Sequence, residues 1–225
     1  MTSYRVIIPS ARPENLVACV RSLLAAEPAI DPSCILVVDD GARIRAEPHL
    51  PPVSWIDGIE PFVYARNVNL GIQAALRSDV ILLNDDARLL TPGGFDQLSR
   101  VVRERPRVAV CSAGVRGLVG NPSQLATGRS EFRYEFGSLA FVCVYIPRGV
   151  LDSLGPLDER FIGYGYEDTD YCARARAGGY DLAIWDGCVV DHSGNLPSTY
   201  RNRPDFYGLF EHNREVYLKK WGRLG

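Results

Sequence analysis

The stretch that decides the fold is Val80–Ala87, VILLNDDA, in which four branched aliphatic residues precede an amide and two carboxylates. The apolar run predicts a β-strand buried on both faces. Adjacent acids at the end of such a strand repel each other unless a cation or water separates them. Carboxylates suit hard ions such as Mg²⁺ or Mn²⁺, which also take phosphate oxygens as ligands. The alternative is a solvated turn, because Asn and Asp favour turns.

The composition is that of an ordinary globular chain. It has 225 residues, of which 46% are hydrophobic and 23% charged, and a net charge of −2. This charge argues against a nonspecific polyanion binder. The six cysteines lie far apart without CxxC spacing, as buried thiols do in a cytoplasmic protein. No apolar stretch approaches the roughly 20 residues of a membrane span, and the first 12 residues lack a signal-peptide pattern. We therefore expect a soluble, cytoplasmic protein without a transmembrane segment.

Strand and helix patterns alternate through the first half of the chain. β-branched or apolar runs predict strands, and apolar residues at helical spacing predict helices. The expected order is strand Tyr4–Pro9, helix Glu14–Ala26, strand Cys34–Val38, a short strand at Trp55, a helix over residues 64–77 and strand Val80–Leu83. This order predicts an α/β domain with a mostly parallel central sheet flanked by helices. Ligands of such sheets bind beyond the carboxyl ends of the strands, where Asp39-Asp40 and Asp85-Asp86 stand.

The second half predicts further elements and leaves one region open. Residues 117–133 are either a loop or a hairpin. Gly137 stands near the start of an expected long strand, Phe136–Ile146, where the missing side chain either lets a ligand approach the backbone or simply allows a bulge or close packing. The other expected elements are helix Phe95–Arg105, strand Arg107–Ala113, a helix from Glu167 to Ala177, and two short strands, Leu182–Trp185 and Cys188–Val190.

An aromatic-rich amphipathic helix is expected at the end of the chain. Residues 1–195 form the predicted domain, and residues 196–225 form a loop and this helix. Its apolar face packs either on the domain or on a second subunit in a homodimer. A membrane-surface role is disfavoured, because few cations accompany the aromatic residues.

The turn after the first strand narrows the kind of nucleotide site. It reads Pro9-Ser10-Ala11-Arg12-Pro13, which has neither the GxGxxG pattern nor a P-loop. A nucleotide diphosphate would therefore be held by a metal ion, and the Asp pair supplies ligands for one.

With these motifs in order, the chain resembles the GT-A class of glycosyltransferases and most closely glycosyltransferase family 2. The matching stretches are Val6–Ser10, Val37–Gly41, Ala65–Gly71, Asn84–Asp86, Gly165–Asp170 and His192. The resemblance implies a single GT-A (Rossmann-like) domain. It also implies an inverting enzyme that uses Mn²⁺ or Mg²⁺ and moves a sugar from a UDP, dTDP or GDP sugar to an acceptor hydroxyl.

The resemblance also assigns roles to residues. Asn84-Asp85-Asp86 takes the place of the DXD motif, and its amide at the first position leaves open whether it makes one or two metal contacts. Asp168 is the expected general base, Glu167 holds an acceptor hydroxyl or shapes the loop, and Asp170 caps the helix. The expected metal ligands are Asp86 and His192, and the expected nucleotide-sugar contacts are Pro9, Ser10, Arg12, Asp40, Arg66, Asn69, Asn84, Asp85 and Gly137.

Two other functions stay open from the sequence. A sugar-phosphate nucleotidyltransferase is disfavoured by the missing glycine-rich, basic turn after the first strand. A non-catalytic nucleotide-sugar or glycan-binding domain is disfavoured because it has no use for a general base. The acceptor is a glycan, a lipid-linked sugar, a metabolite, a protein or a modified base.

Overall fold

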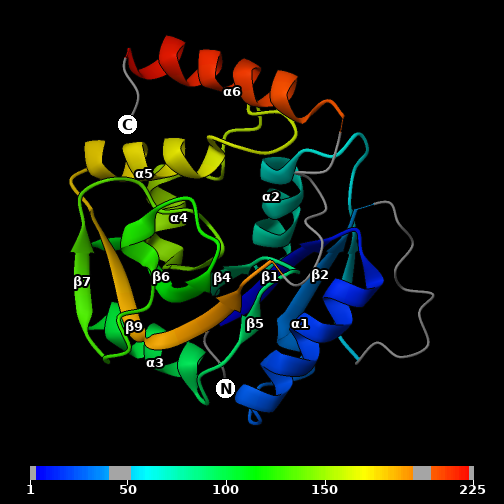
Figure 1. Ribbon diagram of the computed structural model, residues 1–225, viewed down its shortest axis with the longest axis vertical. Coiled ribbons are helices and arrows are strands. Elements are labelled where there is room, and N and C mark those ends of the chain that lie inside the picture. The colour runs from blue at the N-terminus through cyan, green and yellow to red at the C-terminus, as the bar shows by residue number, and fades with distance from the viewer. Residues whose placement is uncertain (1–3, 41–51, 195–203, 223–225) are drawn as a thin grey trace.

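The computed structural model describes residues 4–40, 52–194 and 204–222, and it has the expected α/β architecture (Figure 1). A nine-stranded sheet has the order β3-β2-β1-β4-β8-β6-β9-β5, and β7 pairs with β9 off this path. The strands are β1 (Tyr4–Ser10), β2 (Ile35–Asp39), β3 (Ser54–Asp57), β4 (Asp79–Leu83), β5 (Arg88–Leu89), β6 (Val108–Gly117), β7 (Phe132–Glu135), β8 (Cys143–Ile146) and β9 (Asp181–His192). The helices are α1 (Pro13–Ala26), α2 (Tyr64–Ala74), α3 (Gly94–Arg103), α4 (Arg148–Leu154), α5 (Glu167–Ala177) and α6 (Phe206–Trp221).

The first half of the sheet is parallel, as the sequence predicts. β1 pairs with β2 and β4, and β2 pairs with β3, all in parallel register. The carboxyl ends of β1, β2 and β4 therefore lie at one edge of the sheet. The residues that follow these three strands share that edge, which is where such sheets bind ligands.

The second half mixes both strand directions. β8 is antiparallel to β4 and β6, and β9 is parallel to β6 but antiparallel to β5 and β7. The open region 117–133 contains the end of β6, a short 3-10 turn at Pro122–Gln124 and the start of β7. β6 and β9 together bring Gly117 opposite His192.

The long strand expected over Phe136–Ile146 is wrong. Strands form at Phe132–Glu135 and Cys143–Ile146 instead, and the residues between them cross from one to the other. The backbone groups of this crossing are used by side chains. The Gly137 amide donates to the Glu135 carboxylate at 2.6 Å, and the Arg176 guanidinium donates to the carbonyls of Phe136, at 2.8 Å, and Gly137. Gly137 therefore stands in a turn and not near the start of a strand.

The two short strands expected near the end of the domain are one continuous strand, β9. Its pairing with β6 passes from Ala113 opposite Trp185 to Gly114 opposite Val189, so β9 carries extra residues at a bulge. The bulge is stabilised by Asp186, which accepts a 2.7 Å bond from the Nε of Arg133. The strand continues past the bulge to the edge of the sheet that carries the acidic residues.

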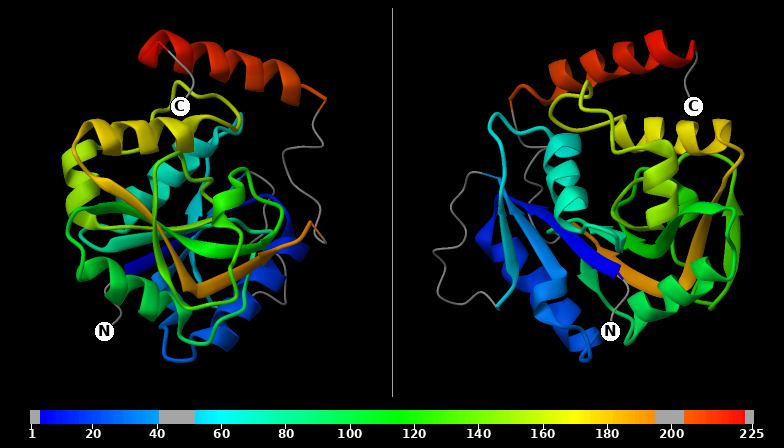
Figure 2. Two further views of the ribbon diagram at one scale, coloured as in Figure 1. Left: turned by 60° about the vertical axis from the view of Figure 1, so that its left-hand side comes forward. Right: turned by 180° about the vertical axis from the view of Figure 1, so that it is seen from behind.

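Two hydrophobic cores fill the two faces of the sheet. Figure 2 shows α1 and α3 on one face and α2, α4 and α5 on the other. The first core includes Leu16 of α1 and Phe95 of α3, and the second includes Val68 of α2 and Tyr171 of α5. All six cysteines are buried free thiols. Within the described residues, no helix combines the length and apolar character needed to cross a bilayer.

Candidate active site

Asp85 stands at the centre of the acidic edge of the sheet. It follows β4 and is buried, and its carboxylate accepts a 2.6 Å hydrogen bond from the hydroxyl of Ser10 at the end of β1. Burial raises the pKa of Asp85 to about 7, and neighbouring Asp86 adds to this rise. Hydrogen bonds from Ser10 and Asn15 and the charge of Arg12 act in the opposite direction. The structure thus brings the expected residues Ser10, Arg12 and Asp85 together.

Asp40 reaches the same edge from β2. Its amide donates to the carbonyl of Ser10 at 2.9 Å, and its carboxylate accepts a hydrogen bond from the side chain of Asn67 on α2. Burial raises the pKa of Asp40 to about 7; Asn67 lowers it, while Glu60 and the other nearby acids raise it. Asn67 lies in the matched stretch Ala65–Gly71 but was not expected to serve the site. Its complete burial on a helix next to polar loops is a pattern that only the fold reveals.

Two further expected residues of this edge have modest roles in the structure. Pro9 lies within β1 opposite Val38 and offers no polar side chain. Asn84 is partly exposed, and its backbone amide donates to the carbonyl of Val142 at 2.9 Å. Its carbonyl accepts a 3.1 Å hydrogen bond from the amide of Ala87, which closes the turn after β4. The next two residues, Asp85 and Asp86, have different partners, Ser10 and His192.

Asp86 and His192 meet at this edge. The Nε2 atom of His192 lies 3.2 Å from Oδ1 of Asp86, although the two residues come from β9 and from the turn after β4. The Nδ1 atom of His192 faces the carbonyl of Leu118, whose own amide donates to the carbonyl of His192 at 2.8 Å. This second partner orients the imidazole so that Nε2 points at the carboxylate, an arrangement common in metal-binding histidines.

The pair fits a divalent ion as a partial set of ligands. A carboxylate oxygen and an imidazole nitrogen that face each other are donors that Mn²⁺ accepts. No group of three or more His, Cys, Asp or Glu side chains that could hold a metal ion is found within the described residues. Water molecules and phosphate oxygens are further ligands that such ions commonly take.

The loop that leads into α5 contains residues with positive φ angles, and two more acids follow it at the start of α5. Gly163, Gly165 and Tyr166 have φ angles of +64°, +113° and +69°. Such angles cost a non-glycine residue energy, and strained backbone of this kind clusters at functional sites. Tyr166 is held in this conformation between the rings of Phe210 and Tyr217 of α6, at centroid distances of 5.1 and 5.5 Å.

The two acids at the start of α5 have different environments. Glu167 is 2% exposed, and its carboxylate accepts a 2.6 Å bond from the amide of Gly165 in its own loop. Asp168 is partly exposed and accepts bonds from the amide and hydroxyl of Thr169 at 2.6 and 3.2 Å. Burial raises the pKa of both carboxyls, and repulsion from Asp168 raises that of Glu167 further. Glu167 is thus bound to its own loop, whereas Asp168 is the less buried of the two acids.

Tyr64, the first residue of α2, is influenced by acids from two different parts of the chain. Its buried hydroxyl has no hydrogen-bond partner among the described residues. Burial raises the pKa of this hydroxyl well above its usual value, and the charges of Glu167, Asp168 and Asp86 raise it further. These carboxylates belong to the turn after β4 and to the first turn of α5, so acids distant in sequence act on one residue of α2.

Arg66 and Asn69 of α2 bind the protein's own backbone. Arg66 donates to the carbonyl of Ile59 at 2.8 Å, and the Asn69 side chain exchanges two 2.9 Å hydrogen bonds with the backbone of Leu157. Both residues line a cavity of about 460 Å³ between α2 and α4. The contacts with a nucleotide sugar expected of them, and of Gly137, stay predictions.

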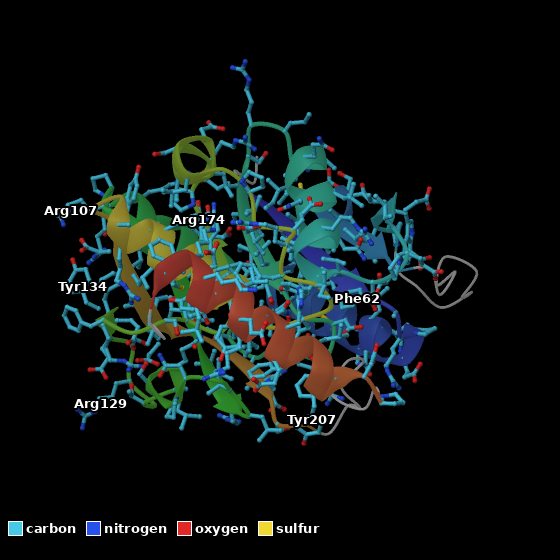
Figure 3. All side chains as sticks on the ribbon, turned by 90° about the horizontal axis from the view of Figure 1, so that it is seen from above. Phe62, Arg107, Arg129, Tyr134, Arg174 and Tyr207 are labelled. Carbon is cyan, nitrogen blue, oxygen red and sulfur yellow. The ribbon has the colours of Figure 1, made fainter. Side chains whose placement is uncertain are left out.

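Helix α6 lies over the loop and α5. Figure 3 looks down on this helix, which crosses that end of the molecule with Tyr207 near its amino-terminal end. Near its other end, Trp221 and Lys220 donate to one carboxylate oxygen of Asp170 at 2.9 and 2.7 Å, while Arg174 pairs with the other at 3.0 Å. Asp170 therefore joins α5 to α6 and does not cap α5 as expected. These contacts lie within one chain; a homodimer stays a prediction.

No model of a known protein family matches the chain. It is 23% identical to the uncharacterized protein y4gI of Sinorhizobium fredii over 225 residues, and 26% identical to the O-antigen biosynthesis protein RfbC of Myxococcus xanthus over 189 residues. These alignments cover 83% and 69% of the chain. The chain spans far less of the relatives themselves, 24% of y4gI and 14% of RfbC.

Two solved structures have the same fold. The mannosyltransferase PcManGT of Pyrobaculum calidifontis, in complex with GDP-Man and Mn²⁺, gives a TM-score of 0.69 at 14% identity, over 99% of this chain and 66% of its own. GalNAc-T7 with UDP, GalNAc and Mn²⁺ gives 0.64 at 15% identity, over 84% of this chain and 43% of its own. The protein thus has the fold of the GT-A glycosyltransferases, as the sequence predicts.

Proposed function

We propose that this chain is an inverting, metal-dependent glycosyltransferase domain that moves a sugar from a nucleotide diphosphate to an acceptor hydroxyl. The observation that carries the proposal is the Asp86–His192 pair, in which an imidazole nitrogen from β9 and a carboxylate oxygen from the turn after β4 face each other at 3.2 Å. The GT-A fold and the complexes of its neighbours with nucleotide sugars or nucleotides and Mn²⁺ support it.

The donor is held by residues at the ends of three strands. Asp40 accepts a hydrogen bond from the base, and Asp85, fixed by Ser10, faces the ribose. Asp86 and His192 hold the divalent ion, which when bound offsets the negative charge that builds on the leaving nucleotide. A carboxylate matches the N–H donors of uracil N3, thymine N3 and guanine N1, whereas adenine N1 is an acceptor. UDP, dTDP and GDP sugars are therefore the proposed donors.

Asp168 takes the proton of the acceptor hydroxyl. The acceptor oxygen forms its bond to the anomeric carbon as the bond from that carbon to the diphosphate oxygen breaks, so the leaving nucleotide carries away the bonding electron pair. Burial raises the pKa of Asp168, and a higher pKa makes a carboxylate a stronger proton acceptor. Asp168 is partly exposed, whereas its neighbour Glu167 is buried.

The affinity for a nucleotide sugar should rise with pH through about 7. Asp40 is protonated below its pKa of about 7 and becomes a carboxylate, an acceptor without a competing proton, above it. Calorimetric titration of a UDP or GDP sugar between pH 5.5 and 8.5 measures this. A nucleotide sugar is the right probe because its diphosphate diester does not titrate in this range. Asp40→Asn should make the rise smaller without removing it, because Asp85 in the same site also has a pKa of about 7. Affinity that falls with rising pH in the unaltered protein would contradict the role of Asp40.

The central experiment is a donor screen with Mn²⁺ and Mg²⁺, read out by thermal shift and by release of free sugar and nucleotide. We expect one or a few nucleotide sugars of the uracil, thymine or guanine type both to stabilise the protein and to be hydrolysed slowly. Stabilisation without any hydrolysis or transfer would indicate the non-catalytic binding domain instead. Release of pyrophosphate from a nucleoside triphosphate and a sugar phosphate would indicate the nucleotidyltransferase.

A further inference from the structure

Asn213 of α6 is fully buried, although it has no role in the proposed donor site. Its hydrogen-bond partners within the described residues are backbone atoms of the loop before α5. Its Oδ1 accepts from the amide of Ile162 at 2.9 Å, and its Nδ2 donates to the carbonyls of Ile162 at 2.8 Å and Gly165 at 2.9 Å. One amide thus fixes both ends of a four-residue stretch.

The same stretch is held from the opposite side by α2. The amide of Tyr64 donates to the carbonyl of Gly163 at 2.8 Å, within a bridge between Val63 and Gly163. The loop lies between two helices, one of which also carries Asn67, the partner of Asp40. A glycine-containing loop with positive φ angles has many alternative conformations when its backbone is free. The bonds of Asn213 and Tyr64 select one of them.

The conformation of this loop determines where the two acids lie. Gly165 donates to Glu167, so the loop and the first residue of α5 are one hydrogen-bonded unit. Asp168 follows directly. α6 also packs closely on position 165, because a Cβ there would lie 3.0 Å from a ring carbon of Phe210, and the φ angle of +113° favours glycine. A shift of the loop would therefore move the carboxylate of Asp168 relative to the proposed metal ligands.

We propose that Asn213 is a positioning residue for sugar transfer, which acts through the backbone of Ile162–Gly165 to hold Asp168 against the acceptor. This inference rests on the proposed function, since it assumes that Asp168 receives the proton. Asn213 does not touch the residues proposed to hold the nucleotide. Its loss should affect the chemical step and leave nucleotide binding unchanged.

The test measures turnover and binding separately in Asn213→Ala. Turnover is the release of free UDP or GDP from the nucleotide sugar that the protein hydrolyses fastest, at saturating donor and with Mn²⁺. Binding is the Kd of UDP or GDP with Mn²⁺, measured by calorimetry well below the melting temperature. We expect kcat to fall about 10- to 100-fold, because misplacement of a catalytic group by about 1 Å has effects of this size. The Kd should change less than about twofold.

Trp221→Phe is the matched control. It removes a hydrogen bond between α6 and Asp170 but no bond to the loop, so it should lower the melting temperature and leave kcat within about twofold. Asn213→Ser, which keeps one donor and acceptor, should lie between Asn213→Ala and the unaltered protein. It serves as the main variant if Asn213→Ala does not fold.

Each outcome separates this inference from the proposed function. If Asp168→Asn is inactive while both Asn213 variants keep normal kcat, the positioning role is refuted and the function stands. If kcat and nucleotide affinity fall together in the Asn213 variants, Asn213 supports the fold as a whole and the positioning role is again refuted. If the unaltered protein neither binds nor hydrolyses any nucleotide sugar, the proposed function fails and this inference with it.

Discussion

Asp168→Asn should abolish nearly all sugar transfer while the affinity for the nucleotide sugar stays within a few-fold. The substitution keeps the shape of the side chain and its oxygen towards Thr169, but an amide cannot take a proton from the acceptor. Loss of a general base typically costs about 10² to 10⁴ in rate. Steady-state turnover together with calorimetric donor binding checks both halves of this expectation.

Glu167→Gln is the informative partner of that variant. The carboxylate of Glu167 is buried and accepts a hydrogen bond from the backbone amide of Gly165. Glu167→Gln keeps an oxygen that can accept this bond, so it should reduce activity far less than Asp168→Asn does. An inactive Glu167→Gln beside an active Asp168→Asn would move the base by one residue. If both variants transfer sugar normally, an inverting mechanism with a carboxylate base is wrong.

Asp86→Ala should weaken both turnover and nucleotide binding in the presence of Mn²⁺. The variant removes one of the two side chains that face each other at 3.2 Å. In the proposed site this carboxylate binds the ion to which the diphosphate also binds. A chelator should likewise stop activity in the unaltered protein, and Mn²⁺ should restore it. Binding of UDP, measured by calorimetry with and without Mn²⁺, should lose most of its metal dependence in Asp86→Ala.

An exposed acid elsewhere provides the control for this experiment. Asp152 on α4 pairs with Arg148 at the surface, and Asp152→Ala should leave metal-dependent UDP binding unchanged. Full turnover of the unaltered protein in excess EDTA would show that the Asp86–His192 pair serves another purpose than holding an ion.

The strands with continuous apolar runs were predictable, and so was the edge where they end. The residues 80–83 and 35–38 fold as buried parallel strands because local composition and burial agree there. The acids that follow them must then share one edge whatever the rest of the chain does. This is why Ser10, Asp40 and Asp85 could be placed together from the sequence.

The errors and omissions concern residues whose partners are far away in sequence. The strand expected over Phe136–Ile146 fails because Arg176, 40 residues further on, takes the carbonyl of Phe136. Asn67 acquires its role from Asp40, 27 positions earlier, and Asn213 from Ile162, 51 positions earlier. Hydrophobic periodicity carries no information about such pairs, because each is set by the packing of complete helices.

The bonds of Asp170 to Lys220 and Trp221 have a consequence for how the molecule opens. Asp170 is fully buried. Release of α6 would remove Lys220 and Trp221 from its carboxylate and leave the ion pair with Arg174 of α5. An ion pair stripped of partners in an apolar place is costly. Detachment of the last helix and loosening of the start of α5 should therefore be a single cooperative event, and amide hydrogens in the two helices should exchange with solvent through the same opening.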